Sequence, residues 1–109
     1  MKISLRNKKC IPCEGGIPSF EQAEIKKYIK HLRPGWIVID GKKLRKQFHF
    51  KNFVEAMAFT NRVAMLAQAE DHHPDMEVHY SNVVVEFWTH AVGGLTENDF
   101  IMAYKIDSK

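Results

Sequence analysis

The chain has 109 residues, of which 45% are hydrophobic and 27% are charged, a composition that predicts one compact domain over 1–109 and excludes a disordered chain. The formal net charge is +3, and its excess lies in two short basic runs at 2–9 and 42–46 without a nucleic-acid motif, so we expect no nucleic-acid partner. No apolar run approaches the roughly 18 residues that span a bilayer, and no signal-peptide core follows the amino terminus, so we expect a cytoplasmic protein that does not bind membranes.

The first part of the chain predicts an irregular arm followed by a helix. Residues 1–18 are punctuated by proline and glycine, which disfavour regular structure. Ser19 with Gln22 has the spacing of a capping box, and apolar residues then recur about every 3.6 residues. Pro34 and Gly35 are expected to end this helix.

A hairpin is predicted next. Residues 36–39 are an apolar, β-favouring run, and the Asp-Gly pair at 40–41 is a strong signal for a tight turn. The returning strand would place Leu44 and Phe48 on one face. Because Lys46 lies between them on that same face, the pattern favours an edge strand or a half-exposed strand.

The longest predicted helix follows this hairpin. Asn52 with Glu55 repeats the capping-box spacing, and a broad apolar face continues for 16 to 18 residues. The helix should end near Glu70, because the proline at position 74 disfavours helical geometry in the residue before it.

The last third of the chain predicts a second hairpin and a third helix. Strands at 78–80 and 83–89 flank a Ser-Asn turn, and alternate residues of the second strand would lie on opposite faces. Two glycines at 93–94 interrupt that strand. Thr96 with Asp99 then predicts the capped start of a helix that continues to about position 105.

These elements predict an α+β fold in the order α-β-β-α-β-β-α. Hairpins join neighbouring strands antiparallel, so we expect a four-stranded antiparallel sheet with three helices packed on one face, a two-layer sandwich. A domain of this size buries only about 60–70% of the surface that its unfolded chain exposes, so self-association would add to its stability.

Three of the six histidines lie where predicted elements end: His72 and His73 after the long helix, and His90 after the last strand. Active sites often form at such ends, and a positioned imidazole accelerates proton transfer by about 100- to 10,000-fold. One histidine at an element end is more often a cap than a catalyst, so the hypothesis depends on all three. Since neighbouring side chains of an extended segment point apart, a local turn is needed for His72 and His73 to face one pocket.

The cysteines and histidines of the chain also allow two interpretations other than acid/base catalysis. Cys10 and Cys13 form a CxxC pair without a second pair, which we interpret as structural, with weak redox chemistry or metal binding as the alternative. The other alternative is a metal site, although the spacing matches no common metal motif and we expect no metal. Its ligands would be Asp71, His72, His73, His79 and His90.

Several motifs together match one family. The chain resembles the pterin-4a-carbinolamine dehydratase family over nearly its whole length, including segments 12–16 and 34–36, which look like stretches of bacterial and plant members. The resemblance implies the same α+β order that the periodicity predicts. The matching residues are Asp71-His72-His73-Pro74, Tyr80, Thr89-His90, Gly94-Leu95-Thr96 and Asp99.

The resemblance implies a hydro-lyase that removes water from a 4a-hydroxy-tetrahydropterin to give a quinonoid dihydropterin, a step of tetrahydrobiopterin recycling after aromatic amino acid hydroxylation. Such a reaction needs a general acid at the leaving hydroxyl and a base for the N5 proton. We expect these to be His72 and His90, in either order, with His73 orienting the substrate, and no metal or organic cofactor. The implied pterin-binding residues are Asp71, His72, His73, Pro74, Trp88, Thr89, His90, Ala91 and Asp99.

One position departs from the family. Its members usually carry an acidic residue one helical turn before the first histidine, where this chain has Gln68. A carboxylate there would orient the imidazole and favour its charged form. Glutamine can still form a hydrogen bond, so we expect Gln68 to support the site, with an altered pH dependence and a lower rate.

The resemblance also implies partners. Members of the family assemble as homodimers and homotetramers through helix and sheet-edge contacts. Animal members also bind a transcription factor, which leaves an alternative function open for this chain: a non-catalytic protein-binding module that acts as a dimerisation partner or transcriptional co-regulator. Such a module would tolerate the loss of His72 and His90, whereas an enzyme would not.

Overall fold

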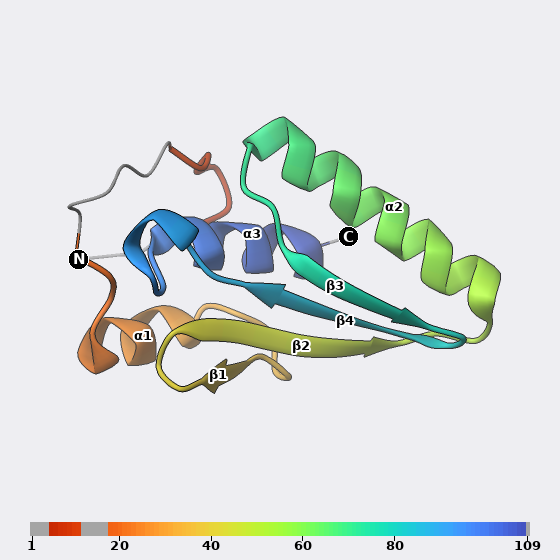
Figure 1. Ribbon diagram of the computed structural model, residues 1–109, viewed down its shortest axis with the longest axis horizontal. Helices are drawn as coiled ribbons and strands as arrows, with labels where there is room; N and C mark the ends of the chain where they lie inside the picture. The colour runs from red at the N-terminus through yellow and green to blue at the C-terminus, as the bar shows by residue number, and fades with distance from the viewer. Residues whose placement is uncertain (1–4, 12–17, 109) are drawn as a thin grey trace.

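A computed structural model describes residues 5–11 and 18–108 (Figure 1). Its element order confirms the predicted α-β-β-α-β-β-α fold, and the described part of the arm contains neither helix nor strand. The elements are α1 (Gln22–Ile29), β1 (Ile37–Ile39), β2 (Lys43–His49), α2 (Phe53–Glu70), β3 (Asp75–His79), β4 (Asn82–Phe87), the 3-10 helix η1 (His90–Val92) and α3 (Glu97–Asp107).

The four strands form one antiparallel sheet in the order β1-β2-β4-β3. β2 therefore lies inside the sheet, so the edge-strand alternative is wrong, whereas the half-exposed alternative is confirmed because most side chains of β2 are only partly buried. The ammonium of Lys46 forms an ion pair with Asp107 at 2.8 Å and lies 4.9 Å from the centre of the Phe48 ring. Because its charge is compensated at the end of α3, this lysine is compatible with a central strand.

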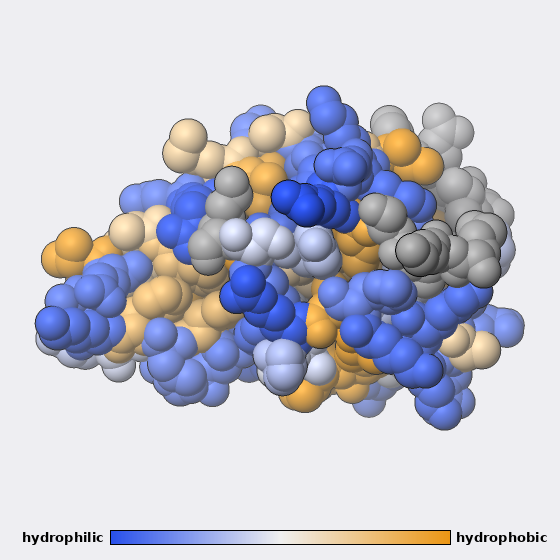
Figure 2. Space-filling model, turned by 180° about the vertical axis from the view of Figure 1, so that it is seen from behind, coloured by the Kyte–Doolittle hydropathy of each residue, from blue (hydrophilic) through white to orange (hydrophobic). Residues whose placement is uncertain are grey.

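The core lies between one face of the sheet and the helices. Odd-numbered residues of β4 face this core and are fully buried at Val83, Val85 and Phe87, as the alternation predicts. Ile25 of α1, the inner residues of α2 such as Phe59, and most of α3 complete the same cluster. The view from behind shows mainly hydrophilic residues with smaller hydrophobic areas between them (Figure 2).

The start of α1 differs from the prediction. Glu21, not Ser19, is the cap, and its side chain forms a reciprocal capping box with Glu24. The backbone N–H of Phe20 donates a 2.7 Å hydrogen bond to the carbonyl of Leu95, which holds the preceding residues against the loop before α3. A contact between segments distant in sequence thus overrides the local capping signal, and the helix also ends more than one turn before the Pro-Gly pair.

The other helix signals are confirmed. Asn52 accepts a hydrogen bond from the backbone of Glu55 at 2.9 Å, and α2 ends at Glu70 as expected. Thr96 and Asp99 form the predicted capping box at the start of α3. Within 5–11 and 18–108, no helix combines the length and the apolar character that crossing a membrane requires.

Candidate active site

The end of α2 provides the local turn that the paired histidines need. Asp71 adopts a left-handed conformation, with φ of 54°, and the backbone N–H of His72 still donates to the carbonyl of Ala67 at 3.1 Å. This cap turns the chain sharply out of the helix. After this turn, His72 and His73 both line the same hollow.

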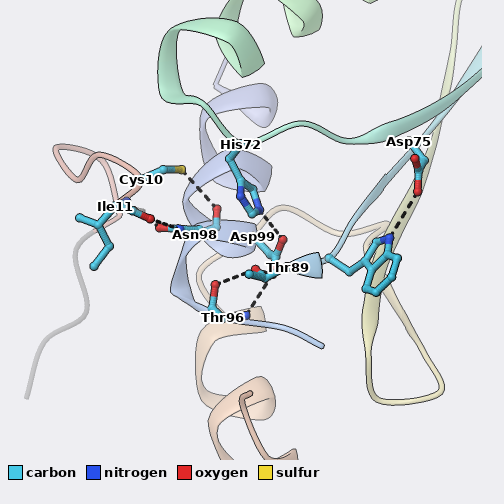
Figure 3. A network of polar contacts seen from close by, with 9 residues as sticks. Cys10, Ile11, His72, Asp75, Thr89, Thr96, Asn98 and Asp99 are labelled. Atoms are coloured by element: carbon cyan, nitrogen blue, oxygen red, sulfur yellow. Dashed lines mark hydrogen bonds and ion pairs between the residues drawn. The ribbon is translucent and has the colours of Figure 1, made fainter. Parts of the chain in front are cut away.

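His72 is fixed by a buried carboxylate (Figure 3). Its Nε2 lies 2.6 Å from Oδ1 of Asp99, whose side chain is fully buried, while 11% of the His72 side chain is exposed. The other oxygen of Asp99 accepts hydrogen bonds from the Thr89 hydroxyl at 2.8 Å and from the backbone N–H of Thr96 at 3.0 Å. These two donors stabilise a carboxylate that burial would otherwise destabilise.

His90 is held from the other side of the site by stacking. Its ring lies 3.9 Å from the ring of Trp88, at an angle of 27°. The indole N–H of Trp88 donates to Asp75 at 3.3 Å, and the ammonium of Lys43 lies 5.1 Å from the Trp88 ring. Trp88 is therefore fixed by the neighbouring strands, and it orients the more exposed imidazole of His90.

These elements enclose a hollow of about 340 Å³, which we call the histidine pocket. A larger hollow of about 520 Å³ lies beside α1 and β1, but Lys26 is the single titratable side chain among the described residues that line it. Size alone therefore does not identify the site. The described residues that line the histidine pocket are Ile11, Asp71, His72, His73, Trp88, Thr89, His90, Ala91 and Asn98.

Three residues expected at the site do not line the pocket. Asp99 lies behind His72, and Gln68 lies behind His73, whose Nε2 is 2.9 Å from the Gln68 amide oxygen. The family pattern predicts a contact of Gln68 with the first histidine, whereas in the structure its partner is the second. Pro74 follows the two histidines and is not among the lining residues.

Two lining residues, Ile11 and Asn98, are not predicted at the site by the sequence. Ile11 belongs to the arm, which has an irregular pattern, and Asn98 is an ordinary second residue of a helix. The two are 87 positions apart, and no local pattern connects them. Their place at the pocket comes from tertiary packing alone.

Comparison with known proteins identifies the family. Residues 18–109 match the family model described as "Pterin 4 alpha carbinolamine dehydratase". The chain belongs to this family. A relative in Rickettsia bellii, named "Putative pterin-4-alpha-carbinolamine dehydratase", is 48% identical over 104 residues, which are 95% of this chain and 92% of the relative.

Solved structures agree with this membership of the dehydratase family. A Brucella melitensis protein described as a "transcriptional coactivator/pterin dehydratase" is 33% identical and superposes with a TM-score of 0.77, over 83% of this chain and 96% of the other. A pterin dehydratase-like protein described as a RuBisCO assembly factor in the alpha-carboxysome has a TM-score of 0.60 over 72% of this chain and 90% of its own. At 20% identity, this second likeness shows the fold alone.

The alternative metal site is not assembled in the part of the chain that the structure describes. His79 lies at the end of β3, where more than half of its side chain is exposed and its Nε2 lies 3.6 Å from Glu77. Among residues 5–11 and 18–108, no three histidine, cysteine or acidic side chains are placed to hold a metal ion together. The ligand set considered from the sequence therefore does not form a cluster.

The CxxC pair is described at one of its two positions, because Cys13 lies outside the described residues. Burial, reinforced by the negative charge of Glu70, raises the pKa of the Cys10 thiol to about 12. The Cys10 thiol therefore stays protonated near neutral pH and is a poor nucleophile and a poor metal ligand. This favours the structural interpretation of Cys10.

Gln68→Glu is expected to shift the pH–rate profile of the site to higher pH. The substitution places a carboxylate against the exposed ring of His73. A neighbouring negative charge favours the protonated imidazole. The measurement is the rate of pterin dehydration from pH 5 to 9. Gln68→Met, which has similar length but no carboxylate, is the control. Superimposable profiles of the wild type and Gln68→Glu would contradict this role.

Glu70→Gln is expected to reduce the loss of stability on acidification. Burial pushes the pKa of Glu70 upward, but hydrogen bonds from Lys105 and from the backbone of Cys10 outweigh it and hold the pKa below its usual value. A lowered carboxyl pKa stabilises the fold above the unfolded-state value, and this contribution is lost as the pH falls through the folded-state value. The variant should be about 1–2 kcal/mol less stable at pH 7 and equal to the wild type at pH 3, as measured by urea unfolding. The role of Glu70 would be refuted if the variant and the wild type differed in free energy of unfolding by the same amount at pH 7 and at pH 3.

Proposed function

We propose that this protein removes water from a 4a-hydroxy-tetrahydropterin to give the quinonoid dihydropterin, and so supports tetrahydrobiopterin recycling after aromatic amino acid hydroxylation. The observation that carries this proposal is the convergence of His72, His73 and His90 on one pocket, with a buried carboxylate behind the first of them. Membership of the pterin-4α-carbinolamine dehydratase family supports the pterin as substrate.

The reaction requires two proton transfers and no change of oxidation state. The bond between C4a and the hydroxyl oxygen breaks, and the oxygen leaves as water with a proton from a general acid. A base takes the proton from N5, and the electrons of that N–H bond form the new double bond between N5 and C4a. The acid and the base regain their starting states by exchanging protons with solvent.

His72 is suited to the role of the base. When it accepts a proton, the imidazolium is stabilised by the Asp99 carboxylate 2.6 Å from its Nε2, as a buried aspartate does for a catalytic histidine in other enzymes. His90 would then be the acid, and its exposed position allows it to be reprotonated from solvent. His73, which is held by Gln68, would orient the substrate.

The pocket also offers a surface for a flat heterocycle. The stacked pair of Trp88 and His90 forms one wall, and Asp71 contributes a carboxylate at the edge. Aromatic side chains favour offset stacking on planar rings, and a carboxylate accepts hydrogen bonds from amino and ring N–H groups such as those of a pterin. Both features agree with the proposed substrate.

The proposal is tested by stopped-flow absorbance with synthetic 4a-hydroxy-tetrahydropterin. The wild-type protein should accelerate its decay at least about 100-fold over buffer, the lower bound for positioned acid/base catalysis. His79→Ala, which removes an exposed histidine at the end of β3, is the matched control and should keep the full rate. If 4a-hydroxy-tetrahydropterin decays at the same rate with the wild-type protein as in buffer, the proposed enzymatic function is wrong.

A binding function is the second candidate, because α2 exposes apolar side chains. Val54 is 75% exposed and Met65 is 74% exposed, and the Brucella melitensis relative is described as both coactivator and dehydratase. We propose that this helix contributes to a homodimer or homotetramer, which sedimentation analysis would detect.

The non-catalytic alternative has a separate test. A module that acts by binding alone would keep its partner when both His72 and His90 are replaced.

A further inference from the structure

We propose that Ile11 forms a fixed wall of the histidine pocket, that Asn98 and the anchored Cys10 hold this wall in place, and that the side chain of Ile11 contacts the bound pterin. This inference rests on the proposed function and extends it to a segment outside the known family motifs. It assigns a substrate-positioning role to a part of the arm that has no helix or strand.

The amide side chain of Asn98 holds Ile11 by two hydrogen bonds of opposite sense (Figure 3). Its Oδ1 accepts from the backbone N–H of Ile11 at 3.0 Å, and its Nδ2 donates to the backbone carbonyl of Ile11 at 2.6 Å. Asn98 is itself buried, with 3% of its surface exposed. One buried side chain thus satisfies both backbone groups of Ile11, as a neighbouring strand would, and fixes the residue in position.

Cys10 connects the arm to α2 and to α3. Its backbone N–H donates to Oε1 of Glu70 at 2.8 Å, and its thiol lies 3.7 Å from the carbonyl oxygen of Asn98. Glu70 is in turn bound by Lys105 at 2.7 Å. Glu70 ends α2 immediately before the histidine turn, and Asn98 precedes the Asp99 that holds His72. The arm is therefore attached to the end of α2 and to the start of α3, the two segments that position His72.

Ile11 exposes 67% of its surface although its backbone is held so closely, and it lines the same pocket as the three histidines. A branched aliphatic side chain adds hydrophobic stabilisation only when another surface covers it. A reduced pterin has saturated edges as well as a planar part, and in the pocket it would cover Ile11. Ile11 would then face the substrate together with the stacked rings of Trp88 and His90.

Steady-state kinetics of point variants test this wall. Ile11→Ala should raise KM about tenfold and leave kcat within about twofold, because it removes an apolar contact that ground state and transition state share. Ile11→Leu should restore KM, since it returns the apolar volume. Ile37→Ala is the matched control, because Ile37 is also an exposed isoleucine, at 55%, on a strand outside the pocket. A KM of Ile11→Ala equal to that of Ile37→Ala would overturn the inference.

The Asn98 clamp is tested separately from catalysis. Asn98→Ala should increase hydrogen exchange at the amide of Ile11 and weaken binding of 7,8-dihydropterin, which has no 4a-hydroxyl to lose, by about tenfold. Unchanged exchange or unchanged affinity would contradict the clamp.

The same ligand separates the two proposals. If the wild type binds dihydropterin but does not accelerate dehydration, the proposed reaction fails, while tenfold weaker binding by Ile11→Ala still supports the wall. If the wild type is active and Ile11→Ala binds and reacts normally, the wall alone fails. If the wild type neither binds dihydropterin nor accelerates dehydration, both proposals are wrong.

Discussion

Replacement of His72 or His90 by alanine is expected to slow dehydration by roughly 100- to 10,000-fold, because each removes one of the two proton-transfer groups. Single-turnover stopped-flow absorbance with the protein in excess over substrate measures this step without a contribution from product release. His73→Ala should mainly raise KM, since this ring is proposed to orient the substrate. The double variant lacking His72 and His90 should be about as slow as the slower single variant, because groups that act as a unit are not additive.

A conservative variant of His72 tests whether this residue acts by proton transfer or only by its hydrogen bond to Asp99. His72→Gln can keep a hydrogen bond to Asp99 but cannot accept a proton from the substrate, so it should remain as slow as His72→Ala. His79→Ala should react at the wild-type rate. If either His72→Ala or His90→Ala reacts as fast as the wild type, the acid/base mechanism is wrong.

Replacement of Asp99 by alanine is expected to destabilise the fold by about 3–5 kcal/mol and to reduce the rate of dehydration. The carboxylate receives hydrogen bonds from Thr89 and from the backbone of Thr96, and it lies 2.6 Å from His72. Its removal leaves these buried donors without their acceptor and also removes half of the capping box of α3. Urea unfolding measures the loss of stability.

Asp99→Asn separates stability from catalysis. The amide keeps one acceptor oxygen and nearly the same shape, so the loss of stability should be smaller than for alanine, while the charge that stabilises a protonated His72 is gone. Asp40→Asn is the matched control, because Asp40 is exposed in a turn at φ of 53°, a conformation that asparagine also adopts. If Asp99→Asn has the stability and the rate of Asp40→Asn, Asp99 does not have the proposed role.

The elements whose signals are local could be predicted from the sequence. The cap at Asn52, the end of α2 at Glu70 and the capping box of Thr96 with Asp99 each depend on residues within one or two helical turns. The shared face of Val83, Val85 and Phe87 follows from the alternation of side chains along a strand, although Val84 on the opposite face is buried too. The end of α2 lies where the local signals place it, so His72 and His73 are recognisable as candidates from the amino-acid pattern. The bounds of the second hairpin are less accurate: β3 covers Asp75–His79 instead of 78–80, β4 ends at Phe87 instead of position 89, and His90 begins a 3-10 helix.

Other features depend on which segments meet, and there the local patterns are insufficient. Ser19 has a good capping sequence, but the pairing of Phe20 with Leu95 holds it in an extended segment. Lys46 resembles an edge-strand residue until Asp107, 61 positions away, supplies its counter-charge. Gln68 lies one turn before His72, yet the sharp turn at Asp71 brings the ring of His73 to it instead.

The sequence by itself thus determined the α+β order, the caps of α2 and α3 and the set of histidines, because hydrogen bonding and hydrophobic periodicity within a short segment specify them. Only the tertiary structure decided that Asp99 stands behind His72, that β2 is a central strand, and that Ile11 and Asn98 form part of the pocket. These contacts join residues 27 to 87 positions apart. The physical reason is that such pairs are brought together by burial of the common core, which no short segment encodes alone.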